Sequence, residues 1–189
     1  MVISDFKRTI AERDFLTGIF MLNNIEDLNM RQPILYEHTP LGYAILNDAL
    51  PIVIALLQKG ASVDVPPGNY PSPLHLASNR GRFEACQWLL QFGADVNGKK
   101  TNGSSALHHA CTNDHLEVSK LLLENGADAN AQDAPKWTAL HYAGYHGHTD
   151  IIELLIDNGA DKSMKNSDGK TALDLARYKK KSEVLELLS

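Results

Sequence analysis

Leucine and alanine recur along this chain at fixed positions every 33 residues. Segment 138–143 reads Thr-Ala-Leu-His-Tyr-Ala, and related segments begin at Thr39, Ser72, Ser105 and Thr171, always with Leu third and Ala sixth. Residues three apart share one helix face, so each segment predicts a helix start with a buried Leu–Ala stripe. The leading Thr or Ser is the residue type that caps a helix N-terminus. Five copies in one register indicate a repeat architecture.

A second apolar segment follows within each of the first four of these units. Paired apolar residues at 56–57, 89–90, 122–123 and 155–156 lie shortly before Gly60, Gly93, Gly126 and Gly159. We expect each of these glycines to take positive φ and to end the helix. Each unit is therefore predicted to be a helix, a short turn, a second helix and a hairpin-like loop, and the chain an all-α solenoid.

This pattern resembles the ankyrin repeat over nearly the whole chain. The resemblance rests on the Thr-Pro-Leu-His type of start, on Gly-Ala-Asp after the second helix and on the period of 33. It implies stacked helix-turn-helix units joined by hairpin-like loops, and a role in binding other proteins. Tyr70 and Lys136 stand where Gly103 and Gly169 occupy the loop turn in other units, so we expect those two loops to depart from the usual turn.

Aligning the copies predicts one domain, residues 1–189, with a capping repeat at each end. The expected units are an N-terminal cap at 1–33, full repeats at 34–66, 67–99, 100–132 and 133–165, and a C-terminal cap at 166–189. In the N-terminal cap, Ser4 aligns with the helix-capping position and Phe6 with the conserved Leu position of the other units. Its first helix is also more polar, as a flank facing water requires.

Composition narrows the class of partner. The formal net charge of −5 argues against nucleic acid, because binding phosphates needs a basic surface. Cys86 and Cys111 lack the spacing of a metal or redox pair, and Cys86 aligns with small, buried positions. Neither a leader sequence nor a membrane-length apolar run is visible, so we expect a cytoplasmic, possibly nuclear, protein without membrane contact.

The eight histidines invite a metal or catalytic hypothesis, which their positions disfavour. His75, His108 and His141 occupy one position in successive units, too far apart to share a metal ion. The family resemblance instead implies that this His hydrogen-bonds near the motif Thr. His115 and His148 follow the inter-helix turn, where we expect them to cap it. No catalytic, cofactor-binding or metal-binding residue is predicted, and the chain is expected not to be an enzyme.

The family resemblance places partner contacts in the loop before the motif Thr and late in the first helix. Carried onto this chain and extended by Tyr70 and Tyr142, the predicted partner-binding residues are Tyr70, Asn79, Arg80, Ser104, Thr112, Asn113, Trp137, Tyr142, Tyr145, His146, Lys170, Tyr178 and Lys179. Trp137 is the most informative, because its equivalents are His38, Pro71, Ser104 and Lys170, so the fold does not require an aromatic residue there. With Tyr142 and Tyr145 it predicts an aromatic patch typical of binding hot spots. The alternative is that Trp137 packs only across its own hairpin.

A cluster of basic residues in the last unit suits a protein partner with an acidic segment, or else keeps the open end of the stack solvated. The leading hypothesis is a protein–protein interaction module, an adaptor, inhibitor or scaffold, that is monomeric alone and binds through the concave groove. The alternative is a structural assembly component that self-associates through an exposed end of the stack. Asn97 and Asn130 resemble hydroxylated asparagines of some ankyrin proteins, although turn chemistry explains them equally well.

Overall fold

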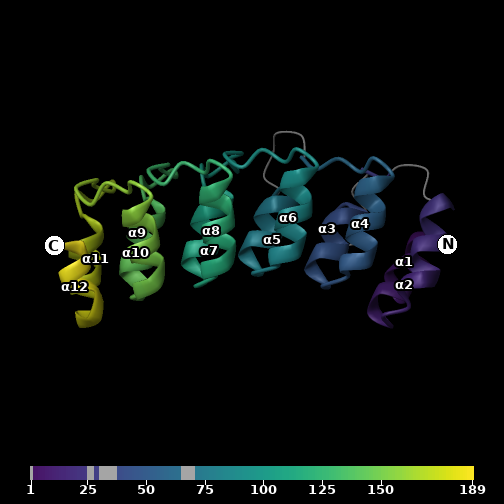
Figure 1. The fold of residues 1–189 in the computed structure, drawn as a ribbon, viewed down its shortest axis with the longest axis horizontal. Coiled ribbons are helices and arrows are strands. Elements are labelled where there is room, and N and C mark those ends of the chain that lie inside the picture. The colour runs from purple at the N-terminus through teal and green to yellow at the C-terminus, as the bar shows by residue number, and fades with distance from the viewer. Residues whose placement is uncertain (1, 25–27, 30–37, 65–70) are drawn as a thin grey trace.

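The computed structural model describes residues 2–24, 28–29, 38–64 and 71–189. In these residues the chain forms antiparallel helix pairs placed side by side in one row, with the two termini at opposite ends (Figure 1). The pairs are α1 (Val2–Ala11) with α2 (Phe15–Met21), α3 (Pro40–Leu46) with α4 (Leu50–Gln58), α5 (Pro73–Asn79) with α6 (Phe83–Gln91), α7 (Ala106–Thr112) with α8 (Leu116–Glu124), α9 (Ala139–His146) with α10 (Thr149–Asp157), and α11 (Ala172–Tyr178) with α12 (Leu185–Leu188). A short 3-10 turn, η1 (Leu22–Asn24), follows α2, and another, η3 (Ser182–Val184), lies between α11 and α12. The predicted all-α repeat solenoid is confirmed.

The Leu–Ala stripe forms the contact between successive pairs. The leucines Leu41, Leu74, Leu107 and Leu140 are each 1% exposed, and the alanines Ala44, Ala77, Ala110, Ala143 and Ala176 are fully buried. First helices contact one another along the row, α3 with α5, α5 with α7, α7 with α9 and α9 with α11. Because alanine has only a methyl side chain, it lets the neighbouring helix approach closely while its burial still removes apolar surface from water.

Within a helix pair of the second and third full units, a serine on one helix faces a cysteine on the other, and the two residue types swap helices between these units. The Ser78 hydroxyl lies 3.7 Å from the Cys86 sulfur, and in the next unit the order reverses, with Cys111 3.5 Å from Ser119. Both thiols are free and buried, and burial raises the pKa of each to about 12. The prediction that Cys86 is a small buried side chain is therefore confirmed, and both thiols are protonated and inert at neutral pH.

The predicted caps form at the helix starts that have a threonine. The hydroxyls of Thr39, Thr138 and Thr171 accept hydrogen bonds from backbone amides three residues on. In the first pair, however, α1 begins at Val2, so Ser4 lies inside the helix and does not cap it. Phe6 is fully buried, as its alignment with the Leu column predicts. The capping interpretation of Ser4 was wrong, because the helix already includes the two residues before it.

The histidine column ties each unit to the next. Nδ1 of His108 and of His141 accepts from the backbone N–H of the residue three positions earlier, so each Nε2 carries the proton. Nε2 of His75, His108 and His141 donates to the carbonyl oxygens of Ser104, Trp137 and Lys170 at 3.0, 3.0 and 3.1 Å. Burial lowers the pKa of all three rings. The structural role implied for this column is confirmed by these bonds.

His115 and His148 also bridge units rather than cap turns. Each occupies the position before a second helix, but neither side chain caps that helix. Instead Nε2 of His115 donates to the Asn79 carbonyl and Nε2 of His148 to the Thr112 carbonyl, both at 3.2 Å. The expectation that these histidines cap the turn is therefore wrong. The nearest unsatisfied carbonyls lie at the end of the preceding unit's first helix, and the rings bond to those instead.

The hairpin loops repeat one turn, even where its glycine is missing. Gly103, Lys136 and Gly169 have φ of 76°, 59° and 74°, and each donates its N–H to the carbonyl three residues earlier. The expected departure at Lys136 is therefore wrong. Neighbouring loops also bond directly, because the N–H of Ala134 donates to the Asn102 carbonyl and that of Ser167 to the Pro135 carbonyl. Tyr70 lies outside the described residues.

Replacing Lys136 by glycine should stabilise the fold. A side chain with a Cβ in the left-handed region costs about 1–2 kcal/mol, while the greater freedom of glycine in the unfolded chain costs about 0.5–1 kcal/mol, so we expect a net gain of up to about 1 kcal/mol. Urea denaturation of the Lys136→Gly variant measures this gain. Gly169→Ala is the matched control and should destabilise, since its φ is 74°. A loss of stability in Lys136→Gly would contradict the shared turn.

Stability should fall as the pH drops below 6.5. His109 is the sharpest case, because burial, followed by Lys100 and the neighbouring histidines, lowers its folded-state pKa to about 4. The unfolded ring protonates near pH 6.5, so between about pH 6.5 and 4 the unfolded state binds more protons and is favoured. His109→Leu introduces the residue found at the equivalent position 76 and should remove about 2–3 kcal/mol of this loss. Urea denaturation at pH 7 and pH 4.5 measures the difference. Equal acid sensitivity in the variant would contradict the assignment.

Candidate binding surface

Three aromatic side chains of the fourth full unit form a contiguous cluster. The ring of Trp137, in the loop before α9, lies 4.8 Å from that of Tyr142 and 5.6 Å from that of Tyr145, centroid to centroid. Tyr142 and Tyr145 belong to α9, and all three residues are partly exposed. We call these three residues the aromatic cluster. The Trp137 ring thus packs on the first helix of its own unit and leaves part of its surface in solvent.

Asp133 holds Trp137 and Tyr142 of the aromatic cluster in place through hydrogen bonds. Its carboxylate accepts hydrogen bonds from the Tyr142 hydroxyl and from the Trp137 backbone N–H, both at 2.7 Å. Burial, followed by the nearby Asp133, raises the pKa of Tyr142 far above its usual value, so the phenol stays a donor. Asp133 is itself buried. Sequence reasoning did not single it out, although an acidic residue opening a tight turn is a common pattern.

Two lysines of the last unit extend the cluster. The Lys179 ammonium lies 4.3 Å from the Tyr145 ring centroid and 5.8 Å from that of Tyr178, and the Lys170 ammonium lies 5.1 Å from that of Tyr178. A hydrogen bond to Tyr145 is the main cause of a raised pKa at Lys179. Tyr178 is 69% exposed. The structure therefore brings together five predicted residues on the last two units: Trp137, Tyr142, Tyr145, Tyr178 and Lys179, with Lys170 at the edge.

His146 borders this surface on α9. It is exposed, and its ring lies 5.1 Å from that of Tyr145 and stacks on that of His148 at 5.4 Å. Burial and then the neighbouring His148 and lysines lower the pKa of His146, so it is neutral at pH 7. The ring thus adds surface to the aromatic cluster without adding charge.

The predicted residues of the second and third full units form a separate polar stretch. Asn113 Nδ2 donates to Asn79 Oδ1 at 3.1 Å, and Arg80 is exposed beside them. The Thr112 hydroxyl donates to the His108 carbonyl within its own helix. Ser104 is buried, and its hydroxyl bonds Asn102 at 2.8 Å, so it offers no surface to a partner. We therefore remove Ser104 from the candidate surface.

Asn97 and Asn130 join successive loops. Each side-chain amide donates to a glycine carbonyl of the next unit and accepts from an aspartate N–H there: Gly126 and Asp128 for Asn97, Gly159 and Asp161 for Asn130. These four bonds measure 2.8–2.9 Å. The bonds account for asparagine at both positions without any modification.

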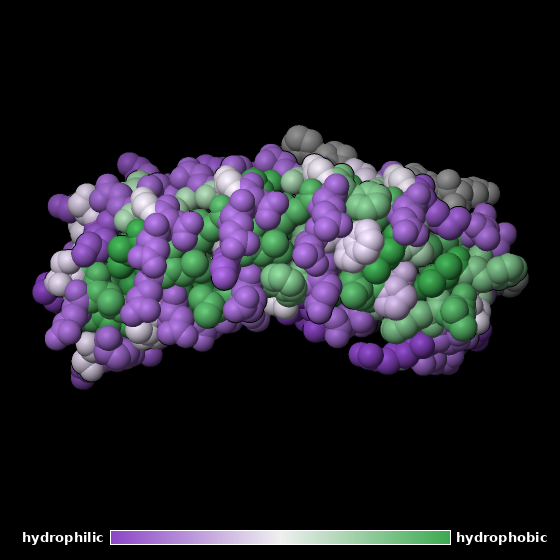
Figure 2. Space-filling model, viewed as in Figure 1, coloured by the Kyte–Doolittle hydropathy of each residue, from purple (hydrophilic) through white to green (hydrophobic). Residues whose placement is uncertain are grey.

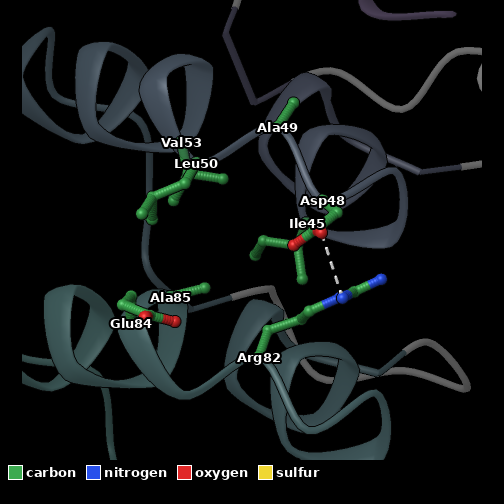
Figure 3. Close-up of a pocket in the computed structure, with 8 residues that line it drawn as sticks. All are labelled: Ile45, Asp48, Ala49, Leu50, Val53, Arg82, Glu84 and Ala85. Carbon is green, nitrogen blue, oxygen red and sulfur yellow. Dashed lines mark ion pairs between the residues drawn. The ribbon is translucent and has the colours of Figure 1, made fainter.

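A small crevice lies on a different part of the stack, between the inter-helix turns of the first two full units (Figure 3). Its lining residues are Ile45, Asp48, Ala49, Leu50, Val53, Arg82, Glu84 and Ala85. Arg82 pairs with Asp48 across it at 3.2 Å, which links adjacent units. The lining combines an apolar floor with one cation and two carboxylates but contains no Ser, Cys or His nucleophile.

Within the described residues, no group of three or more His, Cys, Asp or Glu side chains is arranged to hold a metal ion. Among the helices described, none is both long and apolar enough to span a membrane.

Comparison with protein families accounts for the architecture. A family model described as ankyrin repeats, in three copies, matches residues 64–133 and 128–189. A comparison with curated protein sequences gives no match. The family matches cover well over half of the chain and agree with the stacked helix pairs and the bonded hairpin loops. The chain therefore belongs to the ankyrin-repeat family.

Proposed function

We propose that this chain is a non-enzymatic protein–protein interaction module, an adaptor, inhibitor or scaffold. Ankyrin repeats are generally protein-binding modules. The proposed contact surface consists of the loop tips and first helices on the concave side of the stack. Its centre is the aromatic cluster of the fourth full unit, and Tyr178, Lys170 and Lys179 lie beside it.

One observation carries this proposal: the aromatic cluster is exposed at positions where the fold does not need aromatic residues. The equivalents of Trp137 are His38, Pro71, Ser104 and Lys170. Those of Tyr145 are Leu46, Asn79, Thr112 and Tyr178, of which three are not aromatic. Partly exposed Trp and Tyr held rigidly by their neighbours are the side chains that most often dominate binding energy. Asp133 and the ring contacts supply that rigidity.

Two further statements belong to the proposal. We place the chain in the cytoplasm or nucleus, because both cysteines are free, a state that a reducing compartment maintains. We also propose that it is monomeric alone, with its output determined by whether the partner is bound.

A second candidate, self-association through the N-terminal end, is supported by a specific observation. Leu16 and Phe20, one helical turn apart on α2, are 83% and 71% exposed. Hydrophobic side chains gather at that end of the stack in Figure 2, over α1 and α2. Exposed apolar side chains that lie together are candidates for burial against another chain.

Truncating Trp137 and Tyr145 of the aromatic cluster should strongly reduce partner recovery. In affinity capture from cell lysate, we expect the Trp137→Ala, Tyr145→Ala double variant to recover specific partners at least about tenfold less well, because hot-spot truncations cost more than about 2 kcal/mol. Phe92→Ala is the matched control, since Phe92 is an exposed aromatic residue on the second-helix side of the stack. Circular dichroism checks that all variants are folded. Equal recovery of every partner by the double variant would reject this surface.

The self-association candidate has a separate test. If the N-terminal end associates, the molar mass from light scattering should rise with concentration. The Leu16→Glu, Phe20→Glu variant should then stay monomeric, because charged side chains resist burial. A wild-type mass that stays at one chain across the concentration series would remove this candidate.

A further inference from the structure

The Lys179 ammonium is held in place above the candidate surface. It lies over the Tyr145 ring at 4.3 Å and near that of Tyr178 at 5.8 Å, so it is positioned between first helices of adjacent units. Lys170 contributes a second ammonium over Tyr178 at 5.1 Å. A cation over an aromatic face gains roughly 0.5–1 kcal/mol at exposed sites, and its remaining N–H donors stay available to a ligand.

Neither ammonium is neutralised by a carboxylate in the described part of the chain. The ion pairs found there involve Asp5, Asp48 and Asp114 instead. Asp133, the buried carboxylate beside the aromatic cluster, is already occupied by Tyr142 and Trp137. Asp174 bonds the Thr171 hydroxyl and N–H as a helix cap. The surface therefore presents two oriented positive charges next to apolar rings.

The fold does not require these charges. The Lys179–Tyr145 pair and the Asn113–Asn79 pair occupy equivalent positions in successive units. The Asn113–Asn79 contact is a neutral amide–amide hydrogen bond. The basic character is also local. Residues 165–181 contain six Lys or Arg and two Asp, in a chain whose formal net charge is −5. A local excess of positive charge in an acidic chain favours an acidic ligand at this place.

We propose that the partner segment is an extended acidic peptide in which a carboxylate binds Lys179 and Lys170 while a neighbouring apolar side chain packs on the aromatic cluster. This inference rests on the proposed function. The Lys179 ammonium lies 4.3 Å from the Tyr145 ring centroid. Alternate residues of an extended chain share one face and are about 6.6 Å apart, so we expect the two peptide side chains to be two positions apart. A nucleic acid fits less well, because its long phosphate backbone would meet the negative charge of the remaining chain.

A random peptide display library selected on the wild-type chain tests the proposal. Enriched peptides should carry Asp or Glu two positions from an apolar residue, because alternate residues of an extended chain share one face. A synthetic consensus peptide should bind Lys170→Gln, Lys179→Gln roughly tenfold more weakly than wild type by calorimetry, as two exposed charge pairs predict. Its affinity should also fall with added salt. The matched control is Lys99→Gln, Lys120→Gln, which removes two exposed lysines outside residues 165–181, at positions where the described residues show no ring contact.

The other outcomes distinguish failure of this inference from failure of the proposed function. Peptides that lose binding in the Trp137→Ala, Tyr145→Ala variant but lack acidic residues would overturn this inference and keep the proposed function. Peptides that bind all variants equally, or no enrichment at all, would overturn both. A single-stranded thymidine oligonucleotide serves as the comparison probe. Tighter lysine-dependent binding of that probe than of the acidic peptide would assign the charges to nucleic acid and overturn the inference.

Discussion

Contact between neighbouring units is the constraint on which the whole structure depends. A single pair of short helices buries too little apolar surface to be stable alone, so each unit needs the next. The contact combines fully buried alanines such as Ala110 with leucines such as Leu107, and first helices meet along the row. Histidines such as His108 add a directional bond across the same boundary, from ring N–H to the carbonyl of the following loop.

These contacts separate the side chains that hold the stack from those free to vary. At one position along the first helix the chain has Leu46, Asn79, Thr112, Tyr145 and Tyr178. Such variation costs the stack little, because all five positions are partly or fully exposed to solvent. The surface therefore changes along its length from amides at Asn79 and Asn113 to rings and ammonium groups at Tyr145 and Lys179. A partner that spans it meets different chemistry at each unit, and the order of that chemistry gives direction to the contact.

Several positions show how the stack imposes conformation on residues poorly suited to it. Lys136 adopts the left-handed backbone that Gly103 and Gly169 adopt, in a loop whose Ala134 and Pro135 are bonded to the neighbouring loops. His115 and His148 turn away from their own helices toward carbonyls of the preceding unit. In both cases a contact between units prevails over the local preference of the residue, which is the usual result when tertiary bonds oppose a preference of about 1 kcal/mol.

The sequence alone determined the features that repeat. The period, the Leu–Ala stripe, the Thr caps and the burial of Cys86 all follow from residue type and spacing, because each depends on contacts that recur in every unit. Sequence also indicated Trp137 and Tyr145, as aromatic residues at positions that do not need them. Only the tertiary structure decided that Asp133 anchors two of those aromatic residues, that Ser104 is buried, and that Lys179 lies over Tyr145 from the next unit. These contacts join side chains that differ from unit to unit, so no repeated sequence pattern predicts them. The side chains come close to one another only when the units are stacked.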